Sequence, residues 1–126
     1  MTQAAQIMSQ AKTLTPAEID HMLNYIAQHN FPLRNRVMLL TGLWSGMRVG
    51  EISSLKVGDV MNVDGSVKAE VRLTAEQTKG RQPRTVFLPQ KLRDELTAYL
   101  VLRTGAKPEH PLFVTAGRKA FSANVM

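Results

Sequence analysis

The sequence predicts an α+β domain, mostly helical with a small antiparallel β-sheet. Three segments place apolar residues at helical spacing, whereas residues 67–73 alternate apolar and polar side chains. A chain of 126 residues suits one domain, and a composition of 44% hydrophobic and 21% charged residues is typical of a globular protein. We therefore expect one folded unit over residues 14–126, preceded by a flexible arm over residues 1–13.

The first helix is expected over about residues 16–29. Thr15 has the properties of an N-cap, Pro16 those of a first helical residue, and Glu18 those of the acidic partner in a capping box. An apolar stripe at helical spacing follows, made of Ile19, Met22, Leu23 and Ile26. Pro32 is expected to keep this helix from continuing.

The second helix is expected over about residues 33–45 and is apolar over most of its surface, which indicates a buried central helix. Ser45 and Gly46 end it. A short helical turn follows, with Val49, Ile52 and Leu55 on its apolar side. On the other side Arg48 and Glu51 stand three residues apart, so we expect their side chains to be neighbours.

The expected antiparallel strands span residues 67–74 and 84–88, with a hairpin loop between them. A short strand near residues 60–63 could add a third. The last helix is expected over about residues 90–103, and residues 112–114 form a short strand or an extended segment. Ser122 then has the properties of an N-cap, only four residues before the sequence stops, which favours a truncated chain.

Several classes of function are excluded by what the sequence lacks. It has no cysteine, and its three histidines match no metal-ligand spacing. Neither a glycine-rich phosphate loop nor a G-x-S-x-G motif occurs. No apolar run approaches the ~20 residues of a membrane span. We expect no metal, no nucleotide or other cofactor, no membrane contact and a cytoplasmic location.

The charge favours a polyanionic partner. Sixteen lysines and arginines against ten acidic residues give a net charge of +6, and the excess lies beyond the first 30 residues. Such an excess is typical of proteins that neutralise nucleic-acid phosphates, but a basic protein can also simply be soluble. Charge alone leaves both interpretations open.

Two places could carry chemistry. Arg48, between Gly46 and Gly50, can bring a planar guanidinium close to a phosphate, with Glu51 holding its orientation; a surface ion pair is the alternative. Lys79, in the loop Thr78–Arg81, could reach a phosphate or protonate a leaving alkoxide; a solvated turn lysine is the alternative.

Taken in order, these features resemble the first half of the catalytic domain of a tyrosine recombinase, the phage integrase family. The resemblance rests on a capped Leu-Thr-Pro-Ala-Glu-Ile helix, the G-x-R-x-x-E pattern of Gly46–Glu51, the Thr-Lys-Gly hairpin tip and the strand Arg84–Leu88. It extends from Leu14 to Met126, and the order and spacing of the motifs make it specific.

The resemblance implies roles for individual residues. Arg48 is similar to the first catalytic arginine, which binds the non-bridging oxygens of the scissile phosphate, and Glu51 to the acidic residue that supports it. Lys79 aligns with the hairpin lysine, the general acid for the departing 5′ oxygen. The DNA-binding residues expected from this comparison are Arg48, Lys79, Arg81 and Arg84, and the partner is double-stranded DNA.

The later motifs of the family, a His-x-x-Arg and a nucleophilic tyrosine, have no match. Tyr25 and Tyr99 come too early in the order and are expected to pack in or near the core. We expect a fragment that is inactive alone, with a parent that recombines DNA through a 3′-phosphotyrosine, of prokaryotic, phage or mobile-element origin. Apolar surface left uncovered favours self-association. A non-catalytic basic DNA-binding module and a basic protein-interaction domain remain alternatives.

Overall fold

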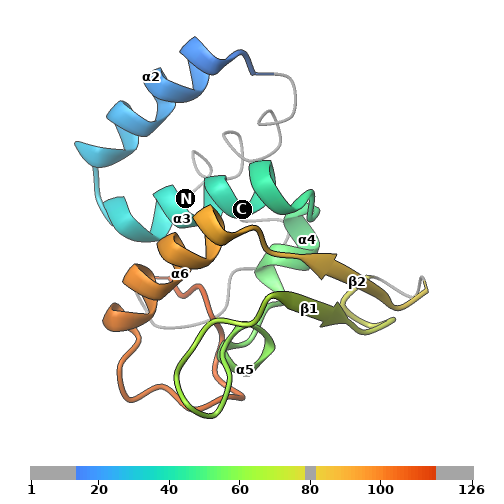
Figure 1. Ribbon diagram of the computed structural model, residues 1–126. Coiled ribbons are helices and arrows are strands. Elements are labelled where there is room, and N and C mark those ends of the chain that lie inside the picture. The colour runs from blue at the N-terminus through green and yellow to red at the C-terminus, as the bar shows by residue number, and fades with distance from the viewer. Residues whose placement is uncertain (1–13, 79–81, 116–126) are drawn as a thin grey trace.

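The computed structural model describes residues 14–78 and 82–115 and has the α+β architecture that the sequence predicts (Figure 1). The expected arm over residues 1–13, the loop residues Lys79 and Arg81, and the expected cap Ser122 lie outside the described residues. In chain order the elements are α2 (Pro16–Ala27), α3 (Pro32–Ser45), α4 (Val49–Ser53), α5 (Val57–Val60), β1 (Glu70–Leu73), β2 (Arg84–Phe87) and α6 (Gln90–Leu102).

Helix α2 begins as predicted, at a complete capping box. The backbone N–H of Thr15 donates to Glu18 Oε1 at 2.9 Å, and the N–H of Glu18 donates to Thr15 Oγ1 at 3.2 Å. These bonds satisfy two of the donors that a helix start leaves open. The helix ends at Ala27, two residues earlier than expected, and Phe31 turns the chain into α3 with a φ of 57°.

Helix α3 lies at the centre and packs against α2 and α6, as its broad apolar surface predicts (Figure 1). One core cluster joins it to the short helices, the sheet and α6; its buried residues are Val37, Met38, Leu40, Met47, Ile52, Leu55, Val57, Val60, Val71, Leu73, Val86, Leu88, Leu92, Leu96, Tyr99, Leu112 and Phe113. The core therefore fixes the end of α3 against the sheet.

Strands β1 and β2 form a two-stranded antiparallel sheet, with Val71 opposite Val86 and Leu73 opposite Arg84. The inward residues of both strands are buried. β1 is shorter than the predicted 67–74. At its start Val67 makes only an isolated bridge to Met61, and at its end a turn follows Leu73, where the N–H of Thr74 donates to Gln77 Oε1 at 2.9 Å.

The third strand that the sequence allowed near residues 60–63 does not form as a strand; its antiparallel pairing is reduced to one bridge at Met61. The residues before it form α5, whose start is held by the Lys56 N–H donating to Asp59 Oδ2 at 2.8 Å. Val57 and Val60, three residues apart, then bury the same side of one helical turn. Only an isolated bridge, Met61 to Val67, adds to the pairing in this region of the described chain.

Residues 112–114, expected as a short strand or an extended segment, differ from that prediction: Leu112 and Phe113 lie in a bend that follows an isolated bridge between Pro111 and Lys56. They are fixed to the body of the domain by the Leu112 N–H, which donates to the carbonyl of Leu55 at 2.9 Å. Within the described residues, no helix has the length and apolar character needed to cross a membrane.

Candidate functional site

The turn that presents Arg48 is shaped by the end of α3. Gly46 ends the helix with a φ of 75°, a left-handed conformation that favours glycine. The hydroxyl of Ser45 accepts the Met47 N–H at 3.1 Å, and the Met47 side chain is buried. Because Met47 points into the core, the next residue, Arg48, points its side chain toward solvent and is exposed.

Glu51 is buried, with 3% of its surface exposed, and its carboxylate holds this turn together. Its Oε1 accepts the backbone N–H of Arg48 at 2.9 Å, as in the second half of a capping box. The same oxygen accepts Nη2 of Arg84 at 2.5 Å. The sequence predicts Arg48 and Glu51 as neighbours, and they are, but the bond to Arg48 is made through the backbone.

The electrostatics keep Glu51 charged. Burial on its own raises the pKa of this carboxyl, but the Arg84 side chain, the Arg48 N–H and the charges of both arginines outweigh burial and lower the pKa below its ordinary 4.5. At neutral pH a buried carboxylate therefore lies between two arginines, and the guanidinium of Arg48 is left exposed.

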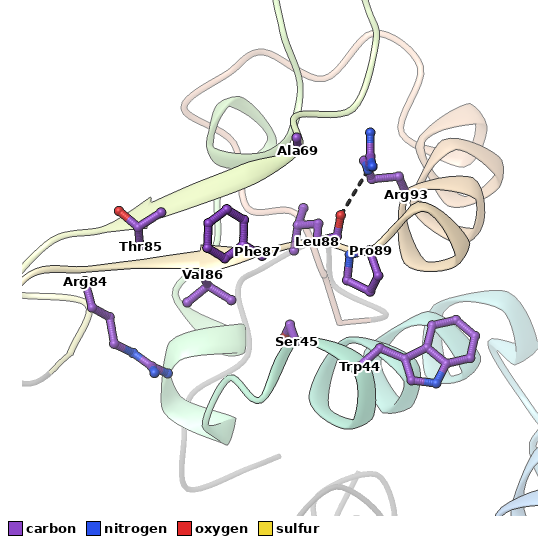
Figure 2. A pocket seen from close by; sticks show the side chains of 10 residues that line it. All are labelled: Trp44, Ser45, Ala69, Arg84, Thr85, Val86, Phe87, Leu88, Pro89 and Arg93. Carbon is purple, nitrogen blue, oxygen red and sulfur yellow. Dashed lines mark hydrogen bonds between the residues drawn. The ribbon is translucent and has the colours of Figure 1, made fainter.

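Arg84 reaches this site from the sheet. It is the first residue of β2, and its side chain extends from the strand toward the short helix α4 (Figure 2). The sequence predicts Arg84 as a DNA-binding residue but gives no sign of its ion pair with Glu51, which lies 33 positions away. The side chain stays 44% exposed, so part of the guanidinium faces solvent.

The hairpin loop is described only at its two ends. Thr78 is buried, and its hydroxyl hydrogen-bonds the carbonyl of Ala75 at 3.0 Å and that of Gln82 at 3.3 Å. Lys79 and Arg81, both expected at the site, lie between these ends and outside the described residues.

An open groove of about 640 Å³ runs beside Arg84 along β2 (Figure 2). Its lining residues are Trp44, Ser45, Ala69, Arg84, Thr85, Val86, Phe87, Leu88, Pro89 and Arg93. Arg93 donates through Nε to the carbonyl of Leu88 at 3.0 Å, the dashed line in the figure. The groove is thus lined by two arginines and two aromatic rings, although Phe87 and Arg84 point to opposite faces of β2 (Figure 2).

Neither tyrosine is arranged as a nucleophile. Tyr99 is buried, its hydroxyl donates to the carbonyl of Leu112 at 2.9 Å, and burial raises its pKa. Tyr25, on α2, stacks its ring on His29 at 3.8 Å between centroids. Both are core or boundary residues, as expected.

The described histidines and carboxylates do not gather as metal ligands. Over residues 14–78 and 82–115, no group of three or more histidine, cysteine, aspartate or glutamate side chains could hold a metal ion. The ring nitrogen Nδ1 of His110 accepts the Lys107 N–H at 3.0 Å, and His29 hydrogen-bonds the carbonyl of Tyr25.

What this arrangement offers a ligand is an exposed cation on an anchored stretch of backbone. The backbone of Arg48 is held by the core and by Glu51, and its guanidinium is exposed with a planar set of donors that matches phosphate oxygens. A family model described as the phage integrase family matches residues 12–125. The chain belongs to the phage integrase family.

Similar proteins agree with this membership. The chain is 33% identical over 108 residues to tyrosine recombinase XerA of Pyrococcus furiosus, covering 86% of this chain and 34% of that protein. It is 30% identical over 108 residues to tyrosine recombinase XerD of Rickettsia conorii, covering 80% and 35%. It is 26% identical over 104 residues to transposase A from transposon Tn554 of Staphylococcus aureus, covering 80% and 28%.

The fold of this phage integrase family member also matches a solved structure. The crystal structure of XerA recombinase superposes with a TM-score of 0.66 at 24% identity, over 88% of this chain and 37% of that one. The chain thus spans about a third of the length of these relatives. The resemblance to tyrosine recombinases noted in the sequence is confirmed, and with it the α+β fold.

Proposed function

We propose that this chain is the part of a tyrosine recombinase that binds the scissile phosphate of double-stranded DNA. The observation that carries the proposal is the buried Glu51, which holds the backbone of Arg48 and leaves its guanidinium exposed. An arginine whose backbone is held in place can present its guanidinium to the non-bridging oxygens, where it stabilises the charge that develops on them.

The other roles follow from the resemblance to the family. Lys79 is proposed as the general acid that protonates the departing 5′ oxygen. Arg84 is proposed to contact a phosphate next to the one that Arg48 binds, and Arg81 is proposed as a further DNA-binding residue from the same resemblance. The parent protein then joins DNA to a tyrosine as a 3′-phosphotyrosine and reseals it, in a prokaryotic cytoplasm where the chromosome or mobile element lies.

The 126-residue chain alone is proposed to bind DNA and not to cleave it. Tyr99 is buried with its hydroxyl bonded to a carbonyl, and Tyr25 lies on α2 against His29, so neither can attack a phosphate held by Arg48. Incubation with a suicide DNA substrate is expected to give no denaturant-resistant adduct. An adduct on Tyr25 or Tyr99 would contradict the assignment.

Salt-dependent DNA binding tests the proposal. We expect fluorescence anisotropy to give a dissociation constant of roughly 10⁻⁴–10⁻⁶ M at physiological salt, with affinity falling steeply between about 50 and 200 mM salt. Arg48→Gln should weaken binding by about threefold to tenfold, because it removes a phosphate contact.

The matched control is Lys107→Gln. Lys107 is exposed on the loop after α6, and its substitution removes the same charge from elsewhere on the molecule. Equal loss in Arg48→Gln and Lys107→Gln would mean that only net charge matters. Binding that is absent at low salt, or independent of salt, would favour a protein-interaction domain.

Self-association is a separate part of the proposal. Val101 and Leu102 lie side by side at the end of α6 and are 68% and 64% exposed, and Phe31 and Phe87 are also exposed. Apolar side chains in such positions favour association. Sedimentation velocity should show dimers at high concentration, and a clean monomer would contradict this part.

A further inference from the structure

Glu51 connects two parts of the structure that are distant in sequence. Its Oε1 accepts one bond from the Arg48 N–H, at the start of α4, and one from Arg84 Nη2, at the start of β2. With 3% exposure the carboxylate has almost no access to water, so its orientation depends on these donors. A change in the orientation of Glu51 therefore alters the hydrogen bond that restrains the amide of Arg48.

Arg84 is well placed to control that orientation. The strand it begins is anchored by pairing with β1, where it lies opposite Leu73, and by the buried Val86 two residues later. The root of the side chain is therefore fixed in the sheet, and its end is fixed on Glu51. This ion pair ties the hairpin to α4.

The direction of the Arg48 side chain depends on its backbone. Arg48 has φ −78° and ψ 157°, extended values imposed at the cap of α4 by the bond to Glu51. Without that bond, the amide of Arg48 loses the acceptor that restrains it at the start of α4, while the buried Met47 still anchors the turn beside it.

We propose that Arg84 is a positioning residue: it fixes Glu51, and through Glu51 it sets the orientation in which Arg48 meets a DNA phosphate. The inference rests on the proposed function, because it names a residue that acts through the phosphate-binding arginine. It goes further in giving Arg84 a role larger than one contact with DNA.

Arg72 offers a matched control on the same hairpin. It lies on β1, one strand away from Arg84, and its side chain is exposed. Arg72→Gln and Arg84→Gln remove the same charge from the same sheet, but only Arg84→Gln removes the bond to Glu51. We expect DNA affinity to fall by about threefold in Arg72→Gln and by about tenfold in Arg84→Gln. Equal losses would overturn the proposal.

A double-mutant cycle separates positioning from contact. If Arg84 acts through Arg48, then Arg84→Gln combined with Arg48→Gln should lose little more affinity than Arg48→Gln alone. If the two arginines contact DNA independently, the two fold-changes multiply. Multiplication would overturn the positioning role.

A spectroscopic test needs no DNA. In ¹H–¹⁵N spectra of the free 126-residue chain, Arg84→Gln should move the amide peak of Arg48 strongly, and Arg72→Gln should leave it in place. Arg84→Lys should restore most of the wild-type position, because a single donor contact to Oε1 can be made by an ammonium. An Arg48 amide peak that ignores Arg84→Gln, or that Arg84→Lys fails to restore, would overturn the proposal. A failure of DNA binding alone would leave these spectra unchanged, so the two proposals fail separately.

Discussion

Two arginine–glutamate ion pairs join elements within the described part of the chain, and they differ in geometry. Between α3 and α6, Arg36 and Glu95 form a bidentate pair, Nε to Oε1 and Nη2 to Oε2, both at 2.9 Å. The two side chains are 42% and 23% exposed. Between β2 and α4, Arg84 makes a single contact, from Nη2 to Oε1 of Glu51, and the Glu51 side chain is only 3% exposed.

This difference in geometry distinguishes an ion pair that joins two helices from one that shapes the candidate phosphate site. In the helix pair both carboxylate oxygens are used by one guanidinium, so the two charges satisfy each other near the surface. In the other pair a buried acid is shared between a side chain and the backbone of Arg48, whose own charge remains exposed. Burying an acid to hold a backbone amide costs desolvation energy, and its benefit here is the fixed position of Arg48.

The largest difference should appear when each arginine is removed. Arg84→Gln leaves a buried carboxylate with one backbone donor, and we expect it to lower the free energy of unfolding by about 1–3 kcal/mol at neutral pH. The measurement is urea unfolding followed by circular dichroism. A loss no larger than that of Arg36→Gln would break the distinction between the pairs.

The pH dependence of this loss is the second expectation. A carboxyl whose pKa is lowered by folding stabilises the fold fully above its unfolded value, near 4.5, and loses that contribution as pH falls through the folded pKa. Arg84→Gln removes a cause of the lowering while burial remains, so the pKa of Glu51 should rise. The difference in stability between wild type and variant should therefore shrink as the pH is lowered from 7 toward 4. A constant difference would contradict the electrostatic explanation.

Arg36→Gln should have a smaller effect. Partly exposed ion pairs contribute about 0–1 kcal/mol, and we expect a loss in that range. In the wild type the pKa of Glu95 is lowered mainly by its hydrogen bond from Arg36. In the variant this pKa should return toward its ordinary 4.5. Carbon-detected NMR titration of the glutamate side chains measures this. A loss of several kcal/mol would show that the helix pair matters as much as the buried acid.

The smallest effect on stability is expected for Arg48→Gln. The side chain is exposed, and the bond to Glu51 uses the backbone N–H, which the variant keeps. The free energy of unfolding should change by less than about 0.5 kcal/mol, although DNA affinity falls. Large destabilisation would mean that Arg48 is structural and not a ligand-binding residue.

The sequence predicted those parts of the fold that depend on local signals. The Thr15 capping box, the buried α3 and the alternating β1 each show a pattern within a few residues. The short helix α5 was missed, because a four-residue segment with buried Val57 and Val60 has too little length to reveal its period.

The contacts of the candidate site also divide into those that local sequence signals predict and those that they do not. The closeness of Arg48 and Glu51 follows from their spacing at the start of a helix and could be predicted. The bond from Arg84 to Glu51 could not, because it depends on where the hairpin lies against α4 after the core has formed. The catalytic and DNA-binding roles of these residues remain predictions.

Titration of the ¹⁵N-labelled chain with a short DNA duplex tests the central claim most directly. If the turn held by Glu51 binds phosphate, the amide of Arg48 and the Arg48 Nε–H should show the largest shift changes. The Arg36 Nε–H, locked in its pair with Glu95, should stay unchanged and serve as the internal reference. Largest changes at Arg36 or along α2, with none at Arg48, would contradict the assignment of this turn as the phosphate site.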